Sequence, residues 1–138
     1  MPVLAIDVGE RRIGVAVSDP GETFALPLET IQRSALRVDL DAIVTLAKDH
    51  GAATIVVGDP LTLKGERGIA SQKMDAFVAA LRKAFEGNVE TIDERMTTAL
   101  VSRRLVAGDV SRGKRKQIVD RLAAAAILET YLARKRNR

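Results

Sequence analysis

The start of the chain holds two short apolar segments separated by a polar turn. Residues 3–8 are apolar on both sides of an extended chain except at Asp7, and residues 13–18 form a second extended segment after a turn at 9–12. Strands that are apolar on both faces usually lie in the centre of a sheet that is covered twice. The pattern predicts a hairpin whose central first strand displays an acidic side chain.

The rest of the chain alternates between short strands and helices. A turn at 19–22 leads to a third strand at 23–30, where Pro27 favours an edge position. Helical spacing of apolar residues predicts further helices, and short apolar runs predict further strands. The expected elements are a helix over 36–47, a strand at 54–57, a polar loop at 58–68, a helix over 74–85, a strand at 89–92, a helix from Thr97 or Thr98 to 107, a basic loop at 108–114 and a last helix over 116–133.

This order of elements defines a fold class. Strands joined by tight turns are antiparallel, whereas strands joined through helices are parallel. We therefore expect an α/β fold with a mixed five-stranded sheet, strand order 3-2-1-4-5 and helices on both faces. Residues 1–138 are expected to form one domain, with 134–138 as a basic, mobile tail.

Composition narrows the class of protein. With 138 residues and 46% apolar content, the chain can bury a real core. It has no apolar run long enough to span a membrane, no signal-peptide pattern and no Cys. These features predict a cytoplasmic protein without membrane contact. The single His, His50, excludes a His-rich zinc site and is expected to be solvated at a helix end.

Charge is distributed unevenly along the chain. Residues 100–138 hold 11 Lys/Arg and 3 Asp/Glu, a net charge of +8, whereas residues 1–99 hold 11 and 15, a net charge of −4. A basic third of a chain favours a polyanionic partner such as nucleic acid. A solvated basic tail is the alternative. Aromatic residues make up only 3%, which argues against binding by base stacking.

Acidic residues follow the strands that are expected to be parallel. Asp7, Asp59 and the pair Asp93–Glu94 lie at the same edge of the predicted sheet. Side chains alternate along a strand, so only one of Asp93 and Glu94 can readily face the same pocket as Asp7. Alternatively, Asp7 caps a neighbouring loop.

Asp120 adds an acid from the last helix. It shares an apolar stripe with Ala123, Ala124 and Ile127, so it is expected to face the packed side. A carboxylate there needs a positive partner, which Arg115, Arg121 or a metal ion could supply. Carboxylates without His or Cys favour Mg²⁺ or Mn²⁺, and such ions suit phosphodiester hydrolysis.

Four motifs together resemble the YqgF (RuvX-like) family over nearly the whole chain. The segment 7–19, with sequence DVGERRIGVAVSD, is similar to the opening signature of that family. The later motifs, VGDPL at 57–61, DERMTT at 93–98 and KQIVDRLAA at 116–124, occur in the family's order. The resemblance implies an RNase H-like fold of the RuvC resolvase type and a metal-dependent nuclease. Family members are described as candidate Holliday junction resolvases and as nucleases that mature the 5′ end of pre-16S rRNA.

The resemblance also implies site residues. Asp7, Glu94 and Asp120 correspond to the family's acids and are expected to be catalytic and to bind the metal. Asp59 departs from the pattern, because the family more often has an apolar residue at this position. RuvC-type resolvases have one acidic site residue on the fourth strand, and Asp59 could partly take that role. Residues expected to contact nucleic acid are Arg11, Arg12, Lys64, Arg95, Arg112, Lys114, Arg115 and Lys116.

Three functions are compatible with these features. The first is a hydrolase acting on RNA or on branched DNA, as a monomer or weak homodimer. The second is a nucleic-acid-binding module whose acidic residues do not catalyse cleavage. The third is a sugar-kinase-like ATP binder, since that fold also opens with an acid-bearing hairpin. Those proteins need a second similar domain, for which 138 residues leave no room.

Overall fold

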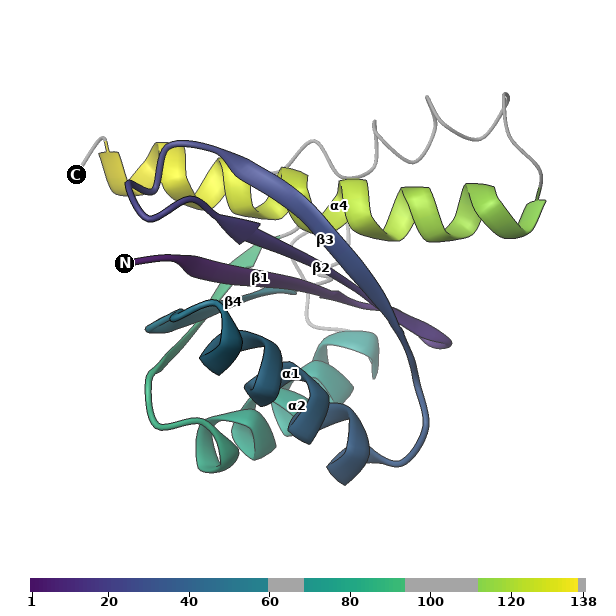
Figure 1. Cartoon of the computed structure of the whole chain (residues 1–138). Helices are drawn as coiled ribbons and strands as arrows, with labels where there is room; N and C mark the ends of the chain where they lie inside the picture. The colour runs from purple at the N-terminus through teal and green to yellow at the C-terminus, as the bar shows by residue number, and fades with distance from the viewer. Residues whose placement is uncertain (60–68, 94–111, 137–138) are drawn as a thin grey trace.

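The computed structural model describes residues 1–59, 69–93 and 112–136 (Figure 1). The described elements are β1 (Val3–Val8), β2 (Arg12–Ser18), β3 (Ala25–Gln32), α1 (Leu36–Asp49), β4 (Thr54–Asp59), α2 (Ile69–Ala84), β5 (Asn88–Asp93) and α4 (Arg112–Arg136). None of the described helices combines the length and apolar character that a membrane crossing requires. The helix expected between Thr97 and residue 107 lies outside the described residues.

The strands form one mixed sheet in the order β3-β2-β1-β4-β5, which confirms the expected fold class. β1 pairs with β2 antiparallel and with β4 parallel, and β4 pairs with β5 parallel. The apolar strand β1 is the central strand of this order, and side chains on both of its faces are buried. Strand β3 is an edge strand, as Pro27 indicated, and its register with β2 shifts where Pro27 pairs with Ala16.

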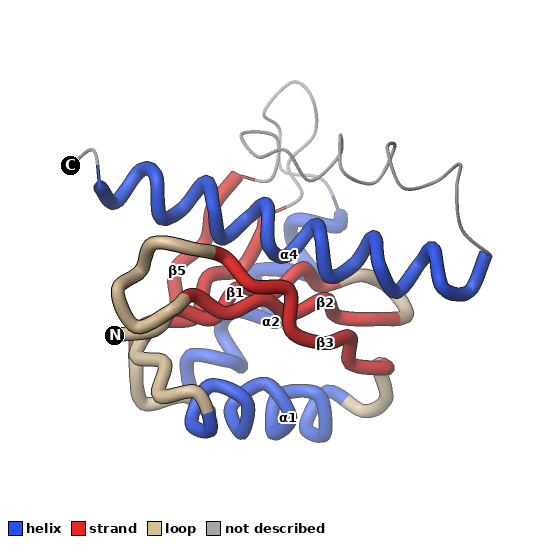
Figure 2. Tube along the Cα trace, turned by 45° about the horizontal axis from the view of Figure 1, so that its top comes forward, coloured by secondary structure: helices blue, strands red, loops and turns tan. Residues whose placement is uncertain are grey.

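Helices cover both faces of the sheet, with α1 and α2 on one side and α4 on the other (Figures 1 and 2). Leu4 and Ile6 of β1 point into the core beneath α1 and α2. Val3 and Ala5 point into the second core, under α4. Side chains alternate along a strand, so this division assigns every position of the sheet to one of the two faces.

Helix α4 lies close to the sheet because its packed face is built from small side chains. The run Ala123–Ala126 is buried, and Ile127 and Leu128 complete the core with Val3 and Val56. The helix begins at Arg112, four residues before the expected start, so Arg112 and Lys114 are helical and not part of a loop. A single glycine, here Gly113, destabilises a helix by only about 1 kcal/mol relative to alanine. The neighbouring Lys, Arg and Gln residues have high helix propensity, so the helix continues through it.

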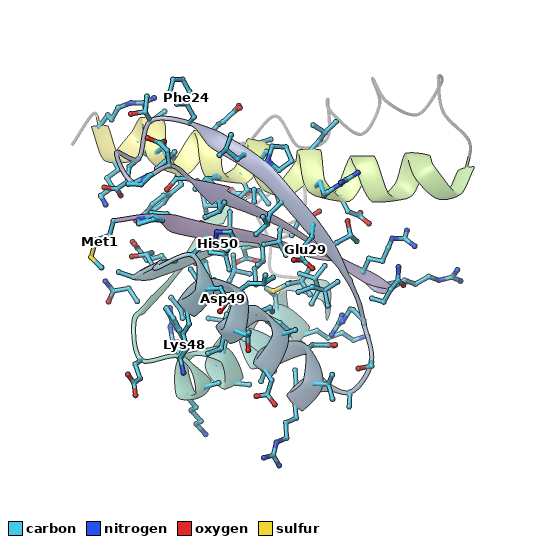
Figure 3. All side chains as sticks on the ribbon, in the orientation of Figure 1. Met1, Phe24, Glu29, Lys48, Asp49 and His50 are labelled. Carbon is cyan, nitrogen blue, oxygen red and sulfur yellow. The ribbon has the colours of Figure 1, made fainter. Side chains whose placement is uncertain are left out.

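The end of α4 also differs from the expected terminal tail. Residues 134–136 form its last turn. The ammonium group of Lys135 lies 2.6 Å from Glu22, and this carboxylate is also 3.9 Å from the N-terminal amine. The pairing brings the two ends of the described chain to the loop between β2 and β3. His50 lies at the end of α1 and is exposed, as expected (Figure 3).

Candidate active site

Asp7 is a nearly buried carboxylate on the central strand. Its exposed fraction is 6%. Because Val3 and Ala5 point toward α4, alternation places Asp7 on the same face of the sheet. Its partner across the antiparallel pair is Gly14 of β2. The strand therefore presents an acid on the α4 face, next to a position that has no side chain.

Gly14 marks the place where α4 touches the sheet. A Cβ atom at Gly14 would overlap the backbone carbonyl of Asp120. Only glycine permits this approach, because any other residue would push the helix away from β2. Asp7 and Asp120, which are distant in sequence, are thus brought to one face of the sheet around a single glycine.

Asp120 has a specific cationic partner. The Nε of Arg12 donates a hydrogen bond of 2.8 Å to Oδ2 of Asp120. The two side chains are only 20% and 21% exposed. Sequence analysis correctly required a positive partner for Asp120 but named Arg115, Arg121 or a metal ion, and not Arg12. The partner comes instead from β2, because alternation along that strand points Arg12, like Gly14, toward α4.

The turn between β1 and β2 is held rigidly behind this pair. It is closed by a hydrogen bond of 2.9 Å from the amide of Gly9 to the carbonyl of Arg12. Arg33 supports the turn from outside: its guanidinium donates to the Gly9 carbonyl at 2.8 Å, and its amide donates to the Arg11 carbonyl at 2.9 Å. The segment that carries Arg12 is therefore fixed at both of its ends.

Arg33 is anchored in turn by a buried acid. Its Nε lies 3.5 Å from Oδ2 of Asp39, which is 1% exposed, and its guanidinium lies over the ring of Phe77 at 5.8 Å. The other oxygen of Asp39 accepts the amide of Ser34 at 3.0 Å. Sequence analysis missed this support. The available signal was Asp39 in the first turn of a predicted helix, six residues after Arg33, within reach of an ion pair.

A small open cavity lies at the same turn. Its volume is about 290 Å³. Its lining residues are Gly9, Glu10, Arg11, Arg12 and Asp120. Arg11 and Arg12, both expected to contact nucleic acid, therefore lie beside one of the expected catalytic acids.

Two other acids lie on the opposite face of the sheet. Val57 of β4 points toward α1 and α2, and so does Val89 of β5. By alternation, Asp59 and Asp93 share that face, and they are partners in the β4–β5 register. Asp59 and Asp7 therefore lie on opposite faces of the sheet. It is the last residue of β4, two residues beyond the expected end of the strand.

Glu94, Lys64 and Arg95 lie outside the described residues. Arg112, Lys114, Arg115 and Lys116 fall in the first turns of α4. Within the described part of the chain, no three His, Cys, Asp or Glu side chains gather into a metal-binding group.

The fold is that of the RuvC-type, RNase H-like resolvases. A Thermus thermophilus RuvC structure in complex with a Holliday junction substrate matches with a TM-score of 0.58 at 18% identity, covering 98% of this chain and 96% of that one. A fowlpox virus resolvase bound to Holliday junction DNA matches with a TM-score of 0.54 at 9% identity, covering 98% and 99%. These two likenesses establish the fold.

The sequence defines the family. The model of the RuvX family, described as Holliday junction resolvase, matches residues 1–134. A Clostridium perfringens protein is 40% identical over 134 residues, which cover 97% of this chain and 98% of the relative. A Natranaerobius thermophilus protein is 40% identical over 139 aligned positions, covering 100% and 98%. Both relatives are named as candidate pre-16S rRNA nucleases. The chain belongs to the RuvX family, as its motifs indicated.

Proposed function

We propose that this protein is a divalent-metal-dependent nuclease that hydrolyses phosphodiester bonds in RNA, as in processing of the 5′ end of pre-16S rRNA. The observation that carries the proposal is the convergence of Asp7 and Asp120 on one face of the sheet around Gly14. Two acids from distant parts of the chain, next to a cavity lined by arginines, form a site suited to phosphodiester chemistry. The names of the two relatives support RNA as the substrate.

The donor set fits a hard cation. Asp7 is nearly buried on the same face as Asp120, and both offer carboxylate oxygens. Asp7, Asp120 and Glu94 would hold Mg²⁺ or Mn²⁺, the ions that oxygen ligands favour. When bound, such an ion makes water a stronger nucleophile and stabilises the charge on the phosphate and on the leaving oxygen.

The arginines supply the other part of the site. Arg11 and Arg12 line the cavity from the β1–β2 turn. Guanidinium groups bind phosphate oxygens through two parallel hydrogen bonds, and they keep their charge at every physiological pH. We propose that this turn, together with the basic residues 112–116 of α4, orients the substrate backbone over the acids. Lys64 and Arg95 belong to the same proposed set of contacts.

The family description gives a second candidate function, cleavage of four-way DNA junctions. A substrate panel separates the two candidates. End-labelled RNA carrying the 5′ leader of 16S rRNA, single-stranded RNA, and a four-way DNA junction are incubated with the protein in Mg²⁺, in Mn²⁺ and in EDTA. We expect cleavage of the RNA that requires the metal. Selective cleavage of the junction would instead support resolvase activity.

Asp7→Asn is the matched variant for this experiment. The amide keeps the shape of the side chain but removes the charge that binds the ion, so cleavage should fall about 10²-fold or more. Binding of the RNA should persist. Normal cleavage by Asp7→Asn, or full activity of the wild-type protein in EDTA, would contradict the proposal. Tight binding that is indifferent to Mg²⁺ and never leads to cleavage would favour a non-catalytic binding module.

A further inference from the structure

The Arg12–Asp120 pair places a permanent cation on a carboxylate of the proposed metal site. Nε of Arg12 lies 2.8 Å from Oδ2 of Asp120, and about four-fifths of each side chain is removed from water. At that distance and burial, the guanidinium neutralises much of the negative charge that Asp120 would offer to another cation. The pair therefore bears directly on how the site takes up a divalent ion.

The backbones that carry Arg12 and Asp120 are both held by contacts in the structure. Its backbone closes the β1–β2 turn, and Arg33 holds that turn through the carbonyls of Gly9 and Arg11. The backbone of Asp120 is fixed against Gly14. Both side chains thus project from anchored backbone positions, which keep the guanidinium within reach of Asp120.

We propose that Arg12 is a positioning residue that holds Asp120 in place and, as a fixed positive charge, opposes the binding of the divalent ion there. This inference rests on the proposed metal site. It adds that Arg12 lowers the affinity of that site for the divalent ion. Two cations sharing one carboxylate repel each other, so removing the charge of Arg12 should strengthen metal binding. If Arg12 served only to hold Asp120 in place, its removal would leave the affinity of the free protein for metal unchanged or weaken it.

The test compares Mn²⁺ binding by calorimetry in the wild-type protein, Arg12→Gln, Arg12→Lys and Arg11→Gln. Gln keeps an N–H donor for Asp120 but loses the charge, and Lys keeps the charge. Arg11→Gln is the matched control, because this neighbouring arginine lines the same cavity and is exposed. We expect Arg12→Gln to bind Mn²⁺ at least roughly ten-fold more tightly, equivalent to about 1.4 kcal/mol. Arg12→Lys should remain near the wild-type affinity, and Arg11→Gln should change it by less than about two-fold.

Thermal unfolding gives a second signature. Without metal, Arg12→Gln should unfold at a lower temperature than the wild type, because Asp120 loses its charged partner. Saturating Mn²⁺ should raise the unfolding temperature of Arg12→Gln by more than it raises that of the wild type. A variant that merely weakened the fold would show the lower temperature without the larger response to metal.

A measurement on the wild-type protein keeps the inference testable even if Arg12→Gln does not fold. In a ¹⁵N-labelled sample, the Nε–H resonance of Arg12 should shift in step with binding of Mg²⁺, whereas that of Arg11 should not. Equal Mn²⁺ affinity in wild type and Arg12→Gln, weaker binding by Arg12→Gln, or an Arg12 resonance that ignores Mg²⁺ would each overturn the role of Arg12 alone. A complete lack of Mn²⁺ binding in all variants would overturn the metal site itself.

Discussion

Gly14 and Asp120 are in direct contact: the strand passes so close to the helix that a single added methyl at Gly14 would overlap the Asp120 carbonyl. Gly14 is also the pairing partner of Asp7. One glycine thus sets the distance between the strand and the helix that carry the two acids of the proposed site. The contact explains why a glycine lies in the middle of a strand whose neighbouring positions, Ile13 and Val15, are buried apolar residues.

Gly14→Ala should therefore damage both stability and activity. Overpacking of this kind costs roughly 1–3 kcal/mol, although Ala is ordinarily the better residue within a strand. Urea unfolding measures the first effect, and cleavage of labelled RNA measures the second. Gly51→Asn is the control, because Gly51 has a φ of 68° in open space, which Asn tolerates. If Gly14→Ala were as stable and active as the wild type, α4 would have to sit further from β2.

Glu94 and Asp93 should separate cleanly into a site residue and a structural residue. Asp93 lies on the α1 and α2 face, opposite Asp7, as the partner of Asp59. We expect Glu94→Gln to lose about 10²-fold or more in cleavage while keeping RNA binding, because a metal ligand is removed. Asp93→Asn should lower the free energy of unfolding more than it lowers turnover. Cleavage assays, fluorescence anisotropy with labelled RNA and urea unfolding measure the three quantities. The opposite pattern would assign the site to Asp93.

The basic start of α4 should carry much of the electrostatic affinity for RNA. Changing Arg112, Lys114, Arg115 and Lys116 to Gln should weaken binding and flatten its salt dependence, by roughly 0.7 in the log–log slope for each phosphate that the protein no longer neutralises. Anisotropy titrations at several KCl concentrations give the slope. The double variant Arg134→Gln/Arg136→Gln serves as the control, since it removes charge from the opposite end of the same helix. An unchanged slope after removal of all four charges would refute the assignment.

Asp19 should make the stability of the protein sensitive to acid. Its carboxylate accepts amide hydrogen bonds from Phe24 at 2.6 Å, Thr23 at 2.8 Å and Gly21 at 3.1 Å, and the hydrogen bond from Phe24 is the main reason that the pKa of Asp19 is lowered. A lowered pKa in the folded state means that the stabilisation is complete above the unfolded-state pKa and is lost as pH falls through the folded-state pKa.

The measurement is the difference in free energy of unfolding between the wild type and Asp19→Ala as a function of pH. The difference should be constant near neutral pH and should shrink below about pH 4, where the unfolded carboxyl takes up its proton. Asp19→Asn provides the comparison, because it keeps an acceptor oxygen but has no titrating proton. Its difference from Asp19→Ala should not vary with pH in this range. If the difference in free energy of unfolding between the wild type and Asp19→Ala did not change as the pH was lowered below about 4, these hydrogen bonds would not depend on the charge of Asp19.

The sequence alone determined the sheet and its order, because local signals carry that information. The double-sided apolar pattern of residues 3–8 marked a central strand, and Pro27 marked an edge strand. Tight turns and intervening helices then fixed which strands are antiparallel and which are parallel. Helical spacing also put Asp120 on the packed side of α4, since periodicity depends only on near neighbours in the chain.

The tertiary structure alone decided which side chains meet. Arg12 and Asp120 are 108 residues apart, and no local pattern relates them. The contact between Gly14 and α4, the support of the β1–β2 turn by Arg33, and the placement of Asp59 away from Asp7 are likewise outcomes of packing. Partners across a sheet or between a helix and a strand depend on register and on the face each residue presents, and a shift of one residue reverses that face. The sequence therefore supplied the acids, and the packing of α4 on the sheet supplied their neighbours.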